Sequence, residues 1–185
     1  TAAIAWPIPL DEAERSAKHP AHPVLGNVAP LTPKRTLVPG ANGQVGRALR
    51  EIMPNADFAD RSRIDLAAPT AFEGVRWADY DTIVNAAAYT KVDEAETDAG
   101  RPAAWAANVA GVARLAQAAT DHGITLVHVS SDYVFDGTHE LYTEDDTFAP
   151  LGVYGQTKAA GDAIIATVPR HYIVRTSWVI GDGNN

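Results

Sequence analysis

The chain has 185 residues, of which 46% are hydrophobic and 21% charged, a balance typical of a folded domain and unlike that of a disordered chain. Its formal net charge of −8 argues against a nucleic-acid partner, because a phosphate backbone is bound by a broad basic surface. The absence of cysteine excludes disulfides and thiolate metal sites, and no apolar run is long enough to span a bilayer, so we expect no membrane partner and a cytoplasmic location.

Residues 1–34 differ in composition from the rest of the chain. They contain six of its twelve prolines and show neither the helix nor the strand period of apolar residues, so we predict an extended linker. The first residue is Thr1, with no methionine and no signal sequence, and the chain ends in a Gly- and Asn-rich stretch. We therefore expect an excised piece of a longer protein.

From residue 35 onward, short apolar runs alternate with Ala-rich helical stretches, which is typical of βαβ units around a parallel sheet. The predicted strands are residues 36–38, 57–59, 82–85, 125–129 and 172–175. The predicted helices are residues 44–52, 69–77, 103–122 and 153–167. Pro102 suits the first turn of the third helix, and Gly123 ends it. The predicted fold class is α/β, a Rossmann-type doubly wound parallel sheet over residues 35–185.

Three glycines at intervals of three residues follow the first predicted strand and open the first predicted helix: Gly40, Gly43 and Gly46. A loop in this place turns sharply and brings backbone amides against a pyrophosphate while helix and strand pack closely, and each task favours a missing side chain. The spacing is typical of short-chain dehydrogenases. It predicts a bound dinucleotide, against the alternative of a plain turn.

The segment after the second strand normally decides between NADH and NADPH, and here it carries charges of both signs. An acidic residue would accept the ribose 2′-hydroxyl of NADH, whereas Arg61 or Arg63 would neutralise the 2′-phosphate of NADPH. Both cofactors stay open, as does the interpretation of these charges as a solvated turn. Asp65 and Leu66 resemble the acidic and hydrophobic pair that flanks the adenine ring in short-chain dehydrogenases.

Small residues follow the third predicted strand, and the segment consists of Ala86, Ala87, Ala88, Tyr89 and Thr90. Where bulky side chains are missing, a cofactor can lie against the backbone at the carboxyl end of a parallel strand, which is where such sheets bind ligands. We predict cofactor contacts from this segment. Tight packing against a helix is the alternative.

Tyr154 and Lys158 lie four residues apart on the last predicted helix and therefore on one helical face, so the ammonium of Lys158 can approach the ribose hydroxyls of a cofactor and the phenol together. We therefore predict that both residues also contact the cofactor. A phenol has a pKa of about 10, and a neighbouring cation favours its ionised form, so Lys158 would make Tyr154 a proton donor near neutral pH. Ser131, just after the fourth strand, would align a carbonyl oxygen for that proton, with Ser130 as the competing candidate. The six histidines are scattered along the chain, so we expect no metal site.

These motifs resemble those of the dTDP-4-dehydrorhamnose reductases, a family of extended short-chain dehydrogenases/reductases. The matching stretches cover most of residues 35–185 and are residues 40–46, 84–96, 130–138, 150–158 and 175–178. The resemblance implies that NADPH or NADH reduces the C4 ketone of dTDP-4-dehydro-β-L-rhamnose, with Tyr154 as the acid, Lys158 as its partner and Ser131 on the oxygen. Ser131 stands where many members carry Thr. Tyr133 stands where related dehydratases carry Glu, which argues for simple reduction.

The same resemblance assigns binding residues. For the cofactor it implies contacts from two segments, Gly43, Gln44 and Val45 in the loop and Ala88, Tyr89 and Thr90 after the third strand. For the dTDP-sugar substrate it implies contacts from Ser131, Asp132, Tyr133 and Trp178. An indole near a strand end is also typical of a core, and that alternative stays open for Trp178.

Residues 6–10 and 16–18 resemble the carboxyl end of dTDP-4-dehydrorhamnose 3,5-epimerase, so we expect a fused epimerase/reductase, with an arbitrary Pro-rich tail as the alternative. The resemblance also implies a missing substrate lobe and a homodimer surface partly outside this chain, so this piece would bind cofactor without turnover. A second class of function stays open. Regulatory subunits of methionine adenosyltransferase are similar in residues 130–137 and serve as dinucleotide-binding partners rather than enzymes.

Overall fold

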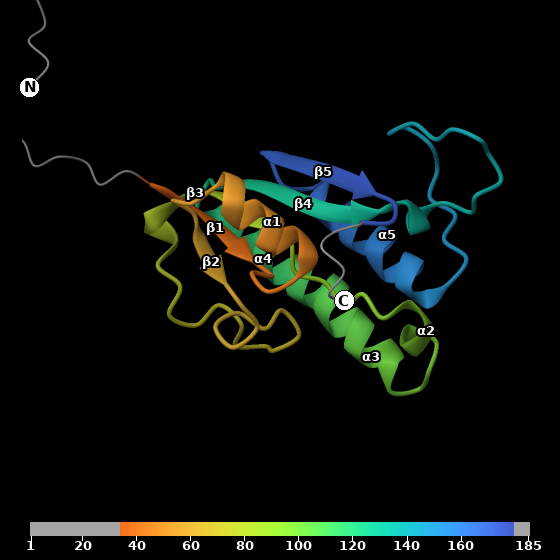
Figure 1. The fold of residues 1–185 in the computed structure, drawn as a ribbon, viewed down its shortest axis with the longest axis horizontal. Helices are drawn as coiled ribbons and strands as arrows, with labels where there is room; N and C mark the ends of the chain where they lie inside the picture. The colour runs from red at the N-terminus through yellow and green to blue at the C-terminus, as the bar shows by residue number, and fades with distance from the viewer. Residues whose placement is uncertain (1–33, 180–185) are drawn as a thin grey trace, which may run out of the picture. The chain divides into compact units, whose positions relative to one another are not determined.

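The structure, a computed structural model, describes residues 34–179 of the chain. Five parallel strands form one sheet in the order β2-β1-β3-β4-β5, as Figure 1 shows. Their bounds are β1 Arg35–Pro39, β2 Asp57–Ala59, β3 Tyr80–Asn85, β4 Thr125–Ser131 and β5 His171–Thr176. The predicted doubly wound parallel sheet is confirmed. The predicted linker and epimerase-like segments lie outside the described residues, so that domain division stays a prediction.

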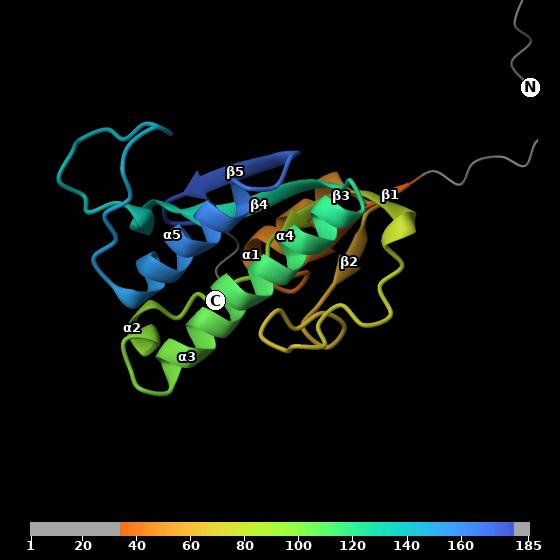
Figure 2. The ribbon, with the colours of Figure 1, turned by 180° about the vertical axis from the view of Figure 1, so that it is seen from behind.

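Helices cover the two faces of the sheet because the chain reverses its direction of travel across it. From β1 it moves to β2 at one edge, and from β2 it crosses back past β1 to β3. Right-handed crossovers in opposite directions place helices on opposite faces. Accordingly, α1 (Gln44–Ile52) lies on the face toward the viewer in Figure 1, whereas α4 (Val112–Asp121) and α5 (Val153–Ile165) lie on the face shown in Figure 2.

The hydrophobic core forms where the central strands meet α4 and α5. It includes Leu37 of β1, Ile83 of β3 and Leu126 of β4, which are fully buried together with Leu115 and Ile165 from the helices. Each such side chain contributes about 1.5 to 3 kcal/mol when it leaves water. The core therefore holds the carboxyl ends of β1, β3 and β4 in fixed positions relative to one another.

The predicted helix over residues 69–77 is wrong. Residues 66–74 form consecutive turns and a bend, and a short 3₁₀ helix, η3 (Trp77–Asp79), follows after residues 75–76. Arg114 from α4 donates from Nη2 to the carbonyls of Leu66 at 2.7 Å and Ala68 at 3.0 Å, so this backbone is bonded to a side chain from another element. Gly74 adopts a φ of +81°, which interrupts a helix.

The long third helix is interrupted rather than regular. It begins with α3 (Gly100–Trp105), passes through a π-helical segment, η4 (Ala106–Gly111), and continues as α4 to Asp121. Pro102 does lie in its first turn, and Gly123, with a φ of +61°, follows its end, as predicted. A short helix, α2 (Val92–Ala95), was not predicted, and α5 ends at Ile165 rather than residue 167.

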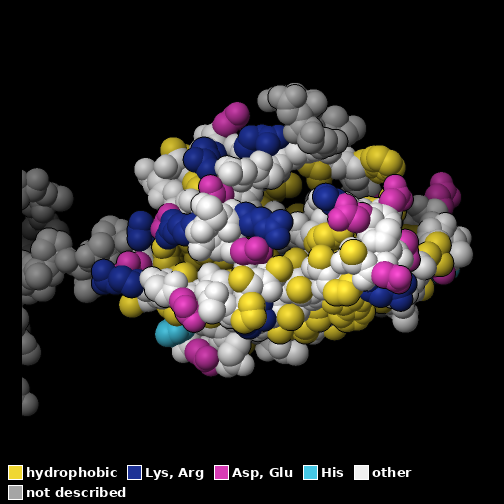
Figure 3. Space-filling view, turned by 90° about the horizontal axis from the view of Figure 1, so that it is seen from below, with side chains coloured by type: hydrophobic (Ala, Val, Ile, Leu, Met, Phe, Trp, Pro, Cys, Tyr) yellow, Lys and Arg dark blue, Asp and Glu magenta, His cyan; other side chains and the backbone are white. Residues whose placement is uncertain are grey.

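An apolar surface runs along α3, η4 and α4. In Figure 3 hydrophobic side chains gather on the face seen from below, where these helices lie in Figure 1. Trp105 is 40% exposed there, and Val109 and Ala110 are also accessible. In the part of the chain that the structure describes, no helix has the length and apolar character needed to cross a bilayer.

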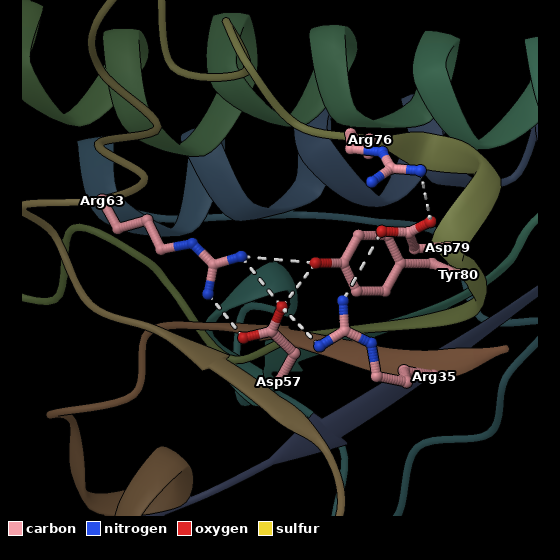
Figure 4. A network of polar contacts seen from close by, with 6 residues as sticks. All are labelled: Arg35, Asp57, Arg63, Arg76, Asp79 and Tyr80. Atoms are coloured by element: carbon pink, nitrogen blue, oxygen red, sulfur yellow. Dashed lines mark hydrogen bonds and ion pairs between the residues drawn. The ribbon is translucent and has the colours of Figure 1, made fainter. Parts of the chain in front are cut away.

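The amino ends of the first three strands are joined by a polar network, drawn in Figure 4. The Asp57 carboxylate accepts from both terminal nitrogens of Arg63 and from the Tyr80 hydroxyl, and Arg35 lies 3.6 Å away. The hydrogen bond from Arg63, assisted by the Tyr80 hydroxyl, lowers the pKa of Asp57 to about 2. The network lies at the edge of the sheet opposite to the carboxyl ends of the strands.

We expect Asp57→Asn to reduce the free energy of unfolding at pH 7 by about 1 to 2 kcal/mol, because the folded state favours the ionised carboxylate. A lowered folded-state pKa contributes stability above the unfolded value of 3.8, and that stability is lost as the pH falls toward 2. Urea unfolding at pH 7, 4 and 2 should therefore show the difference between the two proteins shrinking with acid. Asp79→Asn, at a more exposed ion pair, is the control and should cost less.

Candidate active site

The loop between β1 and α1 is held by close backbone contacts. Gly40 has a φ of +88°, and a Cβ there would lie 2.5 Å from backbone atoms of Ala86 and Ala87. A Cβ on Gly46 would lie 2.2 Å from the carbonyl oxygen of Gly40. Any larger residue at either position would push α1 or β3 out of place. These two glycines are therefore explained by packing within the protein.

Gly43 differs from the other two glycines. Its φ is −71°, and the nearest atom to a Cβ placed there is 3.4 Å away, so the protein itself would accept a side chain. Gly43 is also the N-cap of α1, where no side chain caps the helix and the first turn contains no acidic residue. The first amides of a helix lack intrahelical partners and attract anions. The buried Oε1 of Gln44 has no hydrogen-bond partner, and as an acceptor it would need a donor rather than a phosphate oxygen. This loop fits a pyrophosphate.

The two arginines after β2 that could bind a 2′-phosphate differ in their contacts. Arg63 is bound to Asp57 in the network of Figure 4, whereas Arg61 has an 82% exposed side chain and bonds only to Asp65 at 3.1 Å. The Asp60 carboxylate, directly after β2, accepts from the amide and hydroxyl of Ser62 at 3.0 Å and 2.6 Å, which lowers its pKa. Charges of both signs therefore lie at the position where the ribose would be recognised.

Of the pair predicted to flank the adenine ring, only Asp65 has an accessible side chain. Leu66 is 4% exposed and packs in the core, so its side chain faces the protein interior. Its carbonyl oxygen accepts from Arg114 at 2.7 Å. The adenine contact stays a prediction for Asp65, while the role of Leu66 in the structure is packing.

The segment after β3 is tied to the site by an asparagine that the sequence interpretation missed. Asn108, in the π-helical segment, accepts from the Tyr89 amide at 2.8 Å and donates to the Tyr89 carbonyl and to Thr157 Oγ1, both at 3.0 Å. The Ala86 amide bonds to the Pro39 carbonyl at 3.1 Å. Residues 86–90 thus lie beside the glycine loop and α5. Ala86 to Tyr89 are partly buried and Thr90 is exposed, and their cofactor contacts stay a prediction.

Ser131 and Tyr154 are brought together at the carboxyl end of β4. Ser131 caps the 3₁₀ turn η5 (Asp132–Val134), accepting from the Tyr133 amide at 3.2 Å. The Ser131 hydroxyl donates to Asp132 Oδ1 at 3.2 Å. Burial raises the pKa of Tyr154, and the neighbouring Ser131 side chain opposes that rise. The ring of Tyr133 meets Tyr154 edge-on, with centroids 5.6 Å apart. Ser130 instead has a buried Oγ without a partner, so the geometry favours Ser131 over Ser130.

Lys158 bonds to groups of β4. Its side chain is 2% exposed, and its Nζ bonds to the Val129 carbonyl at 2.8 Å and to His128 Nε2 at 3.3 Å. Burial lowers the pKa of Lys158 to about 8, and the pKa of Tyr154 is raised rather than lowered. The shift of the Tyr154 pKa is thus opposite in direction to the predicted one, and the role of Lys158 as the partner of Tyr154 stays a prediction. Residues on one helical face need not contact each other when buried partners compete.

The three remaining residues predicted to bind substrate are accessible. Tyr133 is 44% exposed and Asp132 is exposed, both beside Ser131. Trp178, with a φ of +44°, is 84% exposed, so among the described residues its indole is not part of the core. Within residues 34–179, no group of three His, Asp or Glu side chains is arranged to hold a metal ion.

Comparison with known proteins is consistent with this geometry. The model of the RmlD substrate binding domain family matches residues 34–185. The chain belongs to this family. Among similar RmlD-type proteins is the dTDP-4-dehydrorhamnose reductase of Aggregatibacter actinomycetemcomitans, 41% identical over 160 residues, which are 82% of this chain and 54% of that protein. The reductase of Sinorhizobium fredii is 42% identical over 158 residues, 78% of this chain and 50% of that protein.

Solved structures of dTDP-4-dehydrorhamnose reductases are also similar to this chain. The dTDP-4-dehydrorhamnose reductase of Bacillus anthracis, in complex with NADP, has a TM-score of 0.75 and 34% identity, covering 82% of this chain and 56% of that one. The reductase from Clostridium acetobutylicum has a TM-score of 0.72 and 35% identity over the same shares. The predicted family resemblance is confirmed. The chain spans about half the length of the curated relatives that it matches.

The difference between the glycines gives a matched test of the loop. We expect Gly43→Ala to weaken NADPH binding by about ten-fold or more while changing the free energy of unfolding by less than about 1 kcal/mol, because its Cβ clashes only with a ligand. Gly46→Ala should instead destabilise the fold by about 2 kcal/mol or more. Fluorescence titration and urea unfolding measure the two effects. Equal binding by wild type and Gly43→Ala would contradict a pyrophosphate at this loop.

Proposed function

We propose that this chain is the dinucleotide-binding and proton-donating part of a reductase that converts dTDP-4-dehydro-β-L-rhamnose to dTDP-L-rhamnose with NADPH or NADH. One observation carries the proposal: Ser131 and Tyr154 are neighbours at the sheet edge where the glycine loop leaves uncapped helix amides. The curated relatives named dTDP-4-dehydrorhamnose reductase support the choice of substrate. We propose the cytoplasm as its location.

The protein's own groups would supply a proton and a means of orientation. When bound, NADPH or NADH supplies a hydride to the C4 carbon. Tyr154 then donates its phenolic proton to the C4 oxygen, and Ser131 donates a hydrogen bond to the same oxygen, which holds the ketone in line. The burial that raises the pKa of Tyr154 keeps the phenol protonated at neutral pH and thus ready to act as an acid.

The other predicted residues would hold the two ligands. Gly43, Gln44 and Val45 would face the pyrophosphate, and residues 86–90 would lie beside the nicotinamide half. Asp132, Tyr133 and Trp178 would contact the nucleotide sugar, which agrees with their exposed side chains. Aromatic rings that are exposed beside a proton donor suit the stacking of a base or a sugar face.

We expect Tyr154→Phe to lower kcat by about 10² to 10⁴-fold, because the variant keeps the ring and loses only the donated proton. The assay follows NADH and NADPH oxidation with dTDP-4-dehydrorhamnose, using the full-length protein that contains this chain. Dinucleotide affinity, measured separately, should change little. Undiminished turnover by Tyr154→Phe would remove Tyr154 from the acid role.

We propose that Arg61 rather than Arg63 binds the 2′-phosphate of NADPH, because the Arg63 guanidinium is already bonded to the Asp57 carboxylate. We expect Arg61→Ala to weaken NADPH binding by about five- to ten-fold and leave NADH binding unchanged, since only NADPH carries the extra phosphate. Arg63→Ala is the control, and it should lower stability while leaving the NADPH to NADH ratio as it is. Parallel titrations with both dinucleotides measure the ratio. An unchanged ratio in Arg61→Ala would assign the choice of cofactor to another group.

The second function class is distinguished by the same assay. A dinucleotide-binding regulatory subunit, similar to that of methionine adenosyltransferase, would bind NADPH without oxidising it in the presence of the ketosugar. The similarity of the relatives named as reductases, at about 40% identity, favours the enzyme. We also propose a homodimer, for which the apolar surface on α3, η4 and α4 is a candidate contact.

A further inference from the structure

The helix that carries Tyr154 does not cap its own first turn. α5 begins after Gly152, which offers no side chain to the amide groups, and its first turn contains no acidic residue. The partner is the carboxylate of Glu96, 57 residues earlier in the chain, because the Val153 amide donates to its Oε1 at 2.7 Å. A carboxylate in this position satisfies a free amide and faces the positive end of the helix dipole. Glu96 therefore caps α5 from another part of the fold.

A tight turn between α2 and α3 delivers this carboxylate. Gly100, the first residue of α3, approaches the carbonyl oxygen of Glu94 so closely that a Cβ there would overlap it. The Thr97 side chain bonds both ends of the turn, accepting from the Gly100 amide at 3.0 Å and donating to the Glu94 carbonyl at 2.7 Å. Arg101 of α3 lies 4.0 Å from the second carboxylate oxygen of Glu96. The backbone on both sides of Glu96 is thus fixed.

Gly152 provides the space that the carboxylate occupies. Its φ of −121° and ψ of 169° are extended values that any residue adopts, so its backbone does not require glycine. Among the described residues, the atom nearest to a Cβ on Gly152 would be Glu96 Oε1 at 2.8 Å, followed by Cδ of the same side chain at 3.9 Å. An alanine here would therefore displace the Glu96 side chain and leave the rest of the packing in place.

The first turn of α5 also fixes Tyr154, which directly follows Val153. Val153 is buried in a small apolar cluster with Ala95 of α2, and the Tyr154 ring packs against that cluster. Gly155, the next residue, approaches the carbonyl oxygen of Tyr133 so closely that a Cβ would overlap it. Tyr154 thus lies between two close contacts along the chain, and loss of the cap would loosen the first of them.

We propose that Glu96 is a positioning residue for Tyr154, whose carboxylate holds the first turn of α5 and thereby directs the phenol toward the substrate ketone. Gly152 belongs to the same arrangement because it leaves room for the carboxylate. This inference rests on the proposed function for its effect on turnover, whereas the contact between Glu96 and the α5 amide does not depend on it. Neither residue was predicted to belong to the site.

The first test measures the cap without substrate or dinucleotide. In the full-length protein that contains this chain, hydrogen exchange followed by ¹H–¹⁵N NMR reports the protection of the Val153 amide. We expect that amide to be protected in wild type and to exchange at least about ten-fold faster in Glu96→Ala and in Gly152→Ala. Asp98→Ala, which removes an exposed carboxylate two residues further on, is the control and should leave the exchange as it is. Unaltered exchange of Val153 in Glu96→Ala would overturn the proposal.

The second test separates positioning from binding. We expect Glu96→Ala to lower kcat for dTDP-4-dehydrorhamnose by about ten-fold and to change the KM values of both substrates by less than about two-fold, because only the phenol is misdirected. Glu96→Gln should recover most of the loss, since its carbonyl oxygen can accept from the same amide. A raised KM with unchanged kcat, or an equal loss in the Gln and Ala variants, would overturn this role of Glu96. Absence of turnover by the wild type would contradict the proposed function and, with it, this role, whereas the exchange test decides the contact separately.

The third test uses two ways of removing one contact. Gly152→Ala displaces the Glu96 carboxylate without deleting it, so it should lower kcat about as much as Glu96→Ala does, while Asp98→Ala keeps the wild-type kcat. In the double variant of Glu96 and Gly152 we expect the loss to stay at about ten-fold, because a contact can be removed only once. A loss of about one hundred-fold, the product of two independent effects, would overturn the shared role of the two residues.

Discussion

The close approach of β1 and β3 is the constraint on which the rest of the site depends. Gly40 lies so near to Ala86 and Ala87 that a Cβ would come within 2.5 Å of their backbone atoms. This contact lies where the chain, after going from β1 to β2, turns back to β3, which is the point at which sheets of this kind bind ligands. A bulkier residue would separate the glycine loop from residues 86–90. It would also separate the loop from Thr157 of α5, which Asn108 connects to the backbone of Tyr89.

Buried polar groups determine the finer geometry of the same edge. Asn108 joins the backbone of Tyr89 to Thr157 of α5, and Asn85 joins the backbone of Ala87 to His128. Each amide satisfies groups that would otherwise be buried without partners, so each strongly limits the positions of its neighbours. The two asparagines therefore link three separate elements, β3, β4 and α5, around Ser131 and Tyr154.

Much of this architecture could be predicted because local patterns and global fold agree. All five strands and the first helix were expected at nearly their observed positions, since apolar runs bounded by glycine and polar residues have few other interpretations. The helix over residues 69–77 failed for the opposite reason. Its residues accept a helical period, but Arg114 binds the carbonyls of Leu66 and Ala68 from a helix more than 45 residues away, and no local pattern contains that bond.

The sequence by itself determined the fold class, the placement of the glycine loop and the expectation that Ser131, Tyr154 and Lys158 belong to one edge of the sheet, because the order of strands and helices along the chain and the spacing within a helix are local properties. Only the tertiary structure decided which of these groups touch. It placed Ser131 near Tyr154, turned Lys158 toward His128 and Val129, and buried Leu66 in the core. The physical reason is that a buried polar group takes the partner that satisfies its hydrogen bonds, and for Lys158 that partner comes from a distant strand rather than from its own helix.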